Sequence, residues 1–300
     1  EASMDVDLAG LPDGVQRLVA LARAVPKKEA EEEAPPTSTL DRLGQPFLDA
    51  GTRVGDALSF LGETTQAFGR LFTKGPQFRR ADLLELTQQA GADALGIVSL
   101  VGLLIGLILA FVGAQQLRQF GASIYVADLV GVAMTRDMAA LITAIVMAGR
   151  SGAAYAAQLG IMKTNQEIDA LSTMGIRPVD YLVVPRMIAL VTMLPILVLF
   201  ADFLGILGGA LAATSMMDVS WTEYWRQTAS AVSVGHVLGG VFKAAVYGAL
   251  VAFAGCYQGM RAERSSMGVG AAATSAVVVG IVAIIAASGL FQILFDILGI

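Results

Sequence analysis

Hydrophobic residues are unevenly distributed along the 300 residues of the chain. After residue 93, five stretches are long and apolar enough to cross about 30 Å of hydrocarbon, which takes roughly 20 residues of helix. The predicted spans are residues 94–117, 136–162, 184–217, 227–260 and 270–297. The pattern therefore predicts an all-α integral membrane protein, and an odd number of spans leaves its two ends on opposite sides of the bilayer.

The residues before the first span follow a different pattern. Large apolar residues at steps of three, four or seven predict one long amphipathic helix over residues 40–72, whose other faces are charged. Such a helix lies either in the membrane interface or against protein. The four glutamates and two prolines of residues 27–36 predict an acidic linker over residues 26–39.

Composition supports the assignment to membranes. Apolar residues make up 55% of the chain, charged residues only 15%, and mean hydropathy is +0.67. The net charge of −5 makes nucleic acid an improbable partner. The single cysteine, Cys256, excludes an internal disulfide, and His236 is the single histidine, so multi-Cys and multi-His metal sites are excluded as well.

The distribution of Lys and Arg near the span ends predicts orientation. Eight lie on the side of the N-terminus and three on the opposite side, which favours a cytoplasmic N-terminus and a periplasmic C-terminus. The first set is Lys74, Arg79, Arg80, Lys163, Arg177, Arg186, Arg261 and Arg264, and the second is Arg118, Arg136 and Arg226.

Glycines recur at the four-residue spacing that allows helices to approach closely in lipid. Three such pairs are expected to pack spans together, whereas the glycines of residues 148–152 are alternatively places where a span bends. The pairs are Gly102 with Gly106, Gly205 with Gly209, and Gly235 with Gly239.

A polar segment between the second and third spans predicts a short helix over residues 165–174. Thr164 and Glu167 form a possible capping box, and Gly175 and Pro178 end the helix. Three apolar residues at three-residue steps, Ile168, Leu171 and Met174, form a knob that docks in a partner's groove or folds back on its own protein.

The run AGRSGAAYAAQLGIMKTNQEIDALSTMGIRPVDYLVVPR, residues 148–186, closely resembles the MlaE/YrbE permease family of ABC transporters, and the resemblance covers roughly residues 40–300. It implies a homodimeric membrane subunit, a cytoplasmic ABC ATPase that holds ATP and magnesium, and an MCE-type substrate-binding partner. It also implies movement of phospholipids or related lipids between the inner and outer membranes of a bacterium.

The resemblance also implies roles for particular segments. Residues 40–72 correspond to an interfacial helix, residues 165–174 to the helix that couples to the ATPase, and residues 1–25 to the remnant of an upstream STAS-like domain. The first and fifth spans line the lipid path. The residues expected to couple to the ATPase are Glu167, Ile168, Asp169, Leu171, Met174 and Gly175, and those expected to line the path are Phe111, Gln115, Leu290, Ile293 and Leu294.

Several positions depart from the family's pattern. Many relatives have Arg-Glu-Leu-Gly-Pro where this chain has 136-RDMAA-140. Asp137, Ala139 and Ala140 therefore replace the Glu, Gly and Pro of those relatives. Gln158 replaces a common Glu, and a Ser288-Gly289 pair stands where some relatives carry an acidic residue.

Ionisable residues within spans are costly and are therefore candidates for function. Arg136, Asp137 and Lys243 are expected either to form an internal polar network or to contact headgroups, and Asp202 either caps a broken span or relays ions. Arg150 is a further candidate for this network. For Arg150, however, we favour a structural role in which its side chain donates hydrogen bonds to carbonyl groups and so ties two spans together.

No G-x-x-x-x-G-K-[ST] phosphate loop occurs, so energy comes from another polypeptide or from a gradient. Two alternatives to an ABC permease follow. Ser151 and His236 suggest an intramembrane serine protease, and the intramembrane charges suggest a gradient-driven secondary transporter.

Overall fold

The computed structural model describes residues 39–216 and 219–298. Within those ranges all regular elements are helical. They are α2 (Thr39–Lys74), α3 (Arg80–Ala90), α4 (Ala92–Arg118), η1 (Ser123–Tyr125), α5 (Val126–Ala133), η2 (Met134–Met138), α6 (Ala139–Met147), η3 (Ala148–Gly152), α7 (Ala153–Thr164), α8 (Glu167–Thr173), η4 (Val179–Val183), α9 (Val184–Met216), α10 (Trp221–Ala231), α11 (Val234–Arg261) and α12 (Ser266–Leu298).

The chain divides within α2 into two units, residues 1–56 and residues 57–300. The predicted STAS-like remnant and almost all of the predicted linker lie outside the described residues. In the first unit, the structure describes only the helical residues 39–56. All contacts discussed below lie within the second unit.

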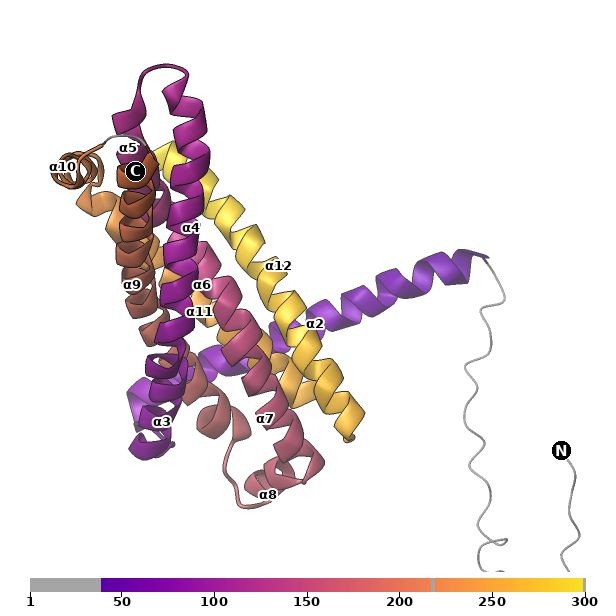
Figure 1. The fold of residues 1–300 in the computed structure, drawn as a ribbon. Coiled ribbons are helices and arrows are strands. Elements are labelled where there is room, and N and C mark those ends of the chain that lie inside the picture. Colours follow the sequence, from indigo (N-terminus) through magenta and orange to yellow (C-terminus); the bar gives the residue numbers. More distant parts are fainter. Residues whose placement is uncertain (1–38, 217–218, 299–300) are drawn as a thin grey trace, which may run out of the picture. The chain divides into compact units, whose positions relative to one another are not determined.

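Among the described residues, five helical stretches are long and apolar enough to cross a membrane, which agrees with the predicted number. They are Arg80–Arg118, Ser123–Thr164, Val179–Met216, Val234–Arg261 and Ser266–Ile297, numbered below as spans one to five. In Figure 1 the elements α3 and α8 lie at one end of these spans, called here the α8 end, and α5 and α10 lie at the other, the α10 end.

The predicted start of span four at residue 227 is wrong. Ser220 accepts a hydrogen bond from the Glu223 amide at 3.2 Å and thereby begins a separate helix, α10. Ser233 then begins α11 by accepting from the His236 amide. Two serine caps 13 residues apart therefore divide what hydropathy alone reads as one segment.

Three π-helical turns interrupt the second and third spans. The turns η2 and η3 separate α5, α6 and α7, and η4 begins span three. Each turn carries charge: Arg136 and Asp137 in η2, Arg150 in η3 and Asp180 in η4. Because π turns are rare and often mark functional sites, these positions direct the search for a site.

Small residues bring α4 and α9 into close contact. A Cβ on Gly106 would overlap the carbonyl of Gly205, and one on Gly102 would lie 2.9 Å from the carbonyl of Ala201. The predicted packing of Gly102, Gly106 and Gly205 is thus confirmed. Gly209 instead faces α5 and α10. A Cβ on Gly209 would lie 2.7 Å from the Val130 side chain of α5 and 2.6 Å from the Tyr224 hydroxyl of α10.

The prediction for Gly235 and Gly239 is wrong in one of its two residues. Among the described residues, a Cβ on Gly235 would meet only the Ser233 cap of the same helix, whereas one on Gly239 would lie 3.1 Å from the Phe295 ring of α12. The backbone contact of α11 is instead formed by glycines on another face of the helix. A Cβ on Gly255 would lie 2.6 Å from the Gly152 carbonyl of η3, so spans two and four touch there.

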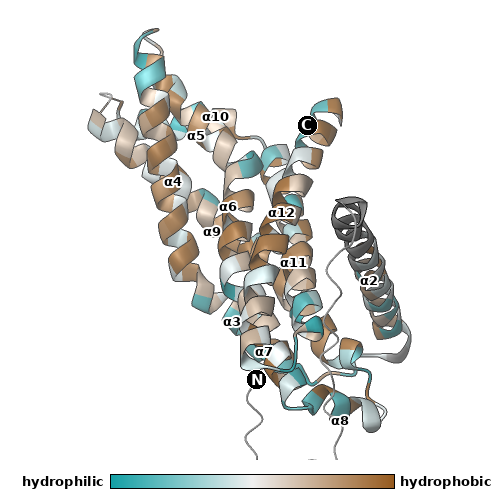
Figure 2. Ribbon diagram, turned by 90° about the vertical axis from the view of Figure 1, so that its right-hand side faces the viewer, coloured by the Kyte–Doolittle hydropathy of each residue, from teal (hydrophilic) through white to brown (hydrophobic). Residues whose placement is uncertain are grey.

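The spans consist largely of apolar residues, which Figure 2 shows as brown stretches on α4, α9 and α12. Exposed side chains include Leu104 and Ile108 on α4 and Val282 and Ile285 on α12. By contrast, α8 is largely polar in the same view. Apolar flanks and polar ends are the pattern that a bilayer requires.

The α4–α9 contact predicts the outcome of a single methyl addition. Gly106→Ala is expected to lower the free energy of unfolding by about 1–3 kcal/mol, because the methyl meets a backbone that cannot retreat. The measurement is thermal unfolding of the purified protein in detergent. Gly96→Ala on the same helix, where nothing lies within 4 Å, is the control and is expected to be neutral or stabilising. Equal effects of the two changes would contradict the proposed contact.

Candidate functional site

The start of α8 differs from the prediction. Gln166 adopts a left-handed conformation with φ of 61° and makes no side-chain cap. Thr164 donates instead to the Gly160 carbonyl at 2.9 Å, inside the last turn of α7, and Glu167 accepts from Asn165 at 3.1 Å. The predicted capping box is therefore wrong, because the chain reverses sharply between the two residues.

The end of α8 is as predicted. Gly175 has φ of 76°, which a glycine adopts without strain. Its amide donates to the Ser172 carbonyl at 3.0 Å, and the Ile176 amide donates to the Leu171 carbonyl at 3.0 Å. These two bonds form a Schellman motif, which gives the helix a fixed end.

The predicted three-residue apolar knob is divided between two environments. Ile168 is buried and Leu171 is half-buried against the core, so both hold α8 on its own protein. Met174 is 66% exposed and remains available to a partner. Asp169 forms an ion pair of 2.6 Å with Arg264 in the turn between α11 and α12, which ties α8 to spans four and five.

A buried charge cluster joins three spans. The Lys243 ammonium, fully buried on α11, lies 3.0 Å from an Asp137 carboxylate oxygen and 3.1 Å from the Arg136 carbonyl oxygen in η2. The Ser288 hydroxyl of α12 donates to the same carboxylate oxygen at 3.5 Å. Lys243 also lies 4.9 Å from the centre of the Phe295 ring.

The other predicted members of that cluster lie outside it or join it differently. Arg136 contributes its carbonyl, and its Nε is buried without a partner among the described residues. Arg150 donates to the Gln89 carbonyl at 3.3 Å, so it ties span two to span one in the way favoured from the sequence. Both carboxylate oxygens of Asp202 are buried on α9 without a hydrogen-bond partner in the described part of the chain.

One chain does not bring the predicted lipid-path residues together. Phe111 and Gln115 lie on α4, which packs mainly on α9. Leu290, Ile293 and Leu294 lie on α12, which packs on α11 and α7. All five are exposed, and they lie on helices whose main packing partners differ.

Ser151 and His236 are too far apart to act as a catalytic pair within one chain. Ser151 precedes Gly152, which packs on Gly255 of α11. His236 lies at the start of the same helix and pairs with Ser233 in its cap. The 19 residues from His236 to Gly255 extend about 28 Å at 1.5 Å per residue. This separation rules out the serine protease.

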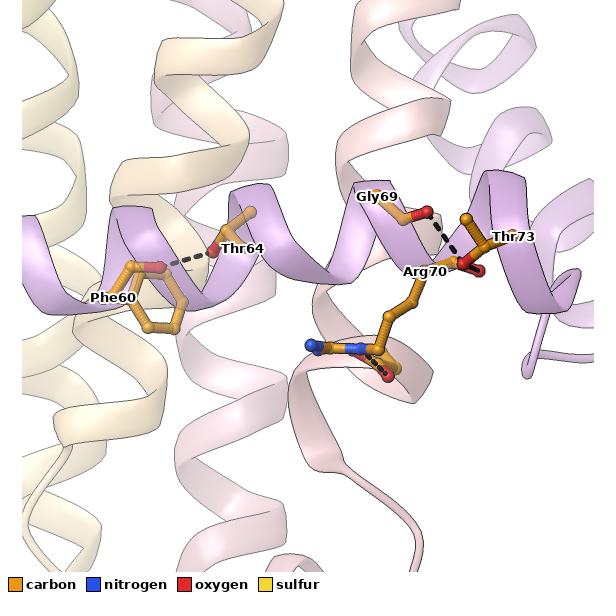
Figure 3. Close-up of polar contacts among 6 residues, drawn as sticks. Phe60, Thr64, Gly69, Arg70 and Thr73 are labelled. Carbon is orange, nitrogen blue, oxygen red and sulfur yellow. Dashed lines mark hydrogen bonds and ion pairs between the residues drawn. The ribbon is translucent and has the colours of Figure 1, made fainter.

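An ion pair that the sequence did not suggest lies at the α8 end. Arg70 of α2 donates from Nε and Nη2 to the two carboxylate oxygens of Asp180 in η4, at 2.9 and 2.5 Å. The bond to Asp180 raises the pKa of Arg70. Figure 3 shows Arg70 pointing from α2 toward the neighbouring segment. No spacing rule relates residues 110 positions apart.

The same part of α2 packs through Phe60 and Ala67, which lie beside the predicted apolar stripe, and through Phe68 of the stripe itself. Phe60 contacts the rings of Phe253 and Tyr257 on α11, with centroids 5.4 and 5.6 Å apart, and Ala67 is buried. Leu58, Leu61 and Phe72, which belong to the stripe, stay exposed. The second half of α2 therefore packs on protein and still presents an apolar surface.

Comparison with known proteins gives a family for this arrangement. The family model described as Permease MlaE matches residues 83–294, which include nearly all of the five spans, α8, and Arg136, Asp137, Lys243 and Ser288 of the charge cluster. The chain belongs to the MlaE permease family. As a member of that family it is an ABC transporter permease, which excludes the gradient-driven transporter.

Three relatives show the range of the MlaE family. A probable ABC transporter permease protein of Synechocystis is 32% identical over 208 residues, 69% of this chain and 79% of the relative. The intermembrane phospholipid transport system permease protein MlaE of Haemophilus influenzae is 31% identical over 77% of this chain and 90% of its own length. The chloroplastic protein TRIGALACTOSYLDIACYLGLYCEROL 1 of Arabidopsis thaliana is 29% identical over 67% of this chain and 57% of its own length.

The charge cluster of this MlaE-family chain predicts a double-mutant result. Lys243→Met leaves the Asp137 carboxylate without its partner and is expected to cost about 3 kcal/mol or more of stability. Adding Asp137→Leu removes the unpaired charge and is expected to restore most of the loss. The measurement is the unfolding midpoint in detergent for the wild type, both single variants and the double variant.

The exposed ion pair between Asp169 and Arg264 provides the matched control. Asp169→Asn breaks an ion pair of similar length whose side chains are about half exposed, and the expected cost is below about 1 kcal/mol. If Lys243→Met costs no more than Asp169→Asn, the cluster does not hold the spans together.

Proposed function

We propose that the chain is the membrane subunit of an ABC transporter that moves phospholipids or related lipids between the inner and outer membranes. ATP hydrolysis on a separate cytoplasmic ATPase drives the movement, and an MCE-type protein passes the lipid on. Membership of the MlaE family supports this proposal, as does the name of the Haemophilus relative, an intermembrane phospholipid transport permease.

The observation that carries the mechanism is the attachment of α8. The helix is closed by a Schellman motif at Gly175, held on its own protein by Ile168 and tied to the α11–α12 turn by Asp169. A force applied to the exposed Met174 is therefore expected to reach spans two and three through the chain and through the contacts of Ile168 and Leu171 with the core. The half-exposed Asp169–Arg264 pair adds only a weak link to spans four and five.

The second ion pair extends this connection to α2. Asp180 lies in η4, directly after the segment that follows α8, and Arg70 holds it with two hydrogen bonds. Bidentate arginine pairs fix geometry as well as distance. Movement of the α8 segment is therefore expected to move the second half of α2 as well.

The lipid path lies between two copies of the chain in this proposal. Exposed apolar residues of α4 and α12, Phe111 and Leu290 among them, face outward on helices with different packing partners. A second copy encloses the space between such faces, where each buried CH₂ of an acyl chain gains about 0.8 kcal/mol. The homodimer is the smallest assembly that supplies both walls.

Orientation follows from the same scheme. The α8 end carries most Lys and Arg and faces the cytoplasm, where ATPases of this class act. Residues before α2 are then cytoplasmic and the C-terminus is periplasmic. The membrane is the bacterial inner membrane, and ATP and magnesium bind the partner ATPase.

Copurification tests the partner. The wild-type chain is isolated from native membranes in mild detergent beside Met174→Asp, which places a charge at the exposed end of α8. An ABC ATPase is expected to copurify with the wild type and to be reduced at least tenfold by Met174→Asp. Ile168 and Leu171 are unsuitable positions because they contact the chain's own core.

Phe120→Asp is the matched control, since Phe120 is exposed on a connection at the α10 end. This variant is expected to retain the ATPase. Loss of the ATPase from both variants, or from neither, contradicts docking at α8, and absence of any ATPase from the wild type contradicts the proposed function.

A further inference from the structure

A cleft of about 240 Å³ opens at the α8 end between α3, α7 and the start of span three. Six polar side chains line it together with apolar groups such as Leu86 and Met162. The polar side chains are Asp82, Glu85 and Gln89 from α3, Gln158 from α7, Tyr181 from η4 and Arg186 from α9. None of the six takes part in the α8 attachment or in the Lys243 cluster.

Arg186 supplies a buried positive charge with no anion beside it. The side chain is 8% exposed, and all of its recorded partners are neutral. It donates to the Leu182 carbonyl at 2.7 Å and to the Gln158 amide oxygen at 3.3 Å, and its guanidinium carbon lies 5.7 Å from the centre of the Tyr155 ring.

Among the described residues, the Nε of Arg186 has no hydrogen-bond partner and no carboxylate lies within ion-pair distance of its guanidinium. Burial of an uncompensated charge is costly unless an anion joins it. The cleft therefore favours an anionic group at this wall.

The α3 wall of the cleft has the opposite charge. Asp82 accepts a hydrogen bond from the Tyr181 hydroxyl at 3.5 Å, and Glu85 accepts one from Gln89 at 3.2 Å. Neither carboxylate has a cationic partner in the part of the chain that the structure describes. A ligand that fits both walls carries a negative and a positive group a short distance apart.

The order of the two charges along the spans matches one class of ligand. Arg186 lies five residues further into span three than Tyr181, a rise of about 7.5 Å toward the hydrocarbon. Asp82 bonds to Tyr181, so the acidic wall extends toward the water. In a zwitterionic phospholipid the phosphate adjoins the acyl-bearing glycerol and the ammonium points outward, which is the same order.

We propose that this cleft binds the headgroup of a zwitterionic phospholipid from the adjacent leaflet. The phosphate pairs with Arg186 and Gln158, the ammonium group pairs with Asp82 and Glu85, and the acyl chains stay in the bilayer. The volume is below the roughly 300–1,000 Å³ of sites that enclose drug-sized ligands, which suits a headgroup rather than a whole lipid. This site goes beyond the proposed function, because it holds whether or not the bound lipid is transported.

Gln158→Glu provides the direct test. The change keeps the shape of the side chain and supplies Arg186 with a carboxylate of the protein, which competes with a phosphate. Binding of dihexanoyl phosphatidylethanolamine to the full chain in detergent, measured by titration calorimetry, is expected to weaken at least tenfold. Gln88→Glu adds the same charge at an exposed position of α3 outside the cleft, and it is expected to bind as the wild type does.

A second variant tests the acidic wall and does not depend on Arg186. The wild type is expected to prefer phosphatidylethanolamine to phosphatidylglycerol of the same chain length at least fivefold, and Asp82→Asn with Glu85→Gln is expected to abolish the preference. This variant also decides the question if Gln158→Glu fails to fold in detergent.

Three results overturn the proposal: unchanged binding in a folded Gln158→Glu variant, equal binding of the two lipids by the wild type, or displacement of the lipid by millimolar inorganic phosphate. The last result would identify a site for free phosphate. Because no ATPase is present, failure here leaves the proposed transport function standing, and failure of copurification leaves this site standing.

Discussion

The structure depends on the absence of water from the middle of a bilayer. Polar backbone groups there must be satisfied within the protein, unpaired charges there are costly, and helices gain contact only by close packing. Glycines meet these demands, because Gly106 admits the backbone of α9 and Gly255 admits that of η3. Close packing of this kind fixes the rotation of each span. It thereby places Lys243 of α11 opposite Asp137 of η2, where the two charges compensate each other.

Irregular turns in these spans coincide with charge. The π turns η2, η3 and η4 contain the residues that bind Lys243, Gln89 and Arg70 respectively. A π turn widens the helix locally and re-aims its side chains, which lets one helix present a charge sideways to another. The charged contacts therefore join different pairs of elements along the molecule.

Local signals in the sequence were sufficient for the spans and for the end of α8. Hydropathy is summed over some twenty residues, so five spans are evident, and Gly175 with Pro178 ends a helix through its own backbone chemistry. The bond from Arg150 to a carbonyl was also foreseen. The remaining features depend on tertiary contacts: the Arg70–Asp180 pair joins distant residues, and the division of Ile168 from Met174 depends on what lies beneath α8. The helix N-caps at Ser220 and Ser233 could have been predicted from the serines themselves, but the apolar residues around Ser233 favoured a single continuous span.

The central claim is that this chain moves lipid only with energy supplied by another polypeptide. The most direct measurement is transfer of a fluorescent phospholipid between vesicles that contain the purified complex of chain, ATPase and MCE-type partner, and acceptor vesicles. Transfer is expected to require ATP and to stop when the ATPase carries an inactivated phosphate-loop lysine. Transfer at the same rate with the inactive ATPase would contradict the account.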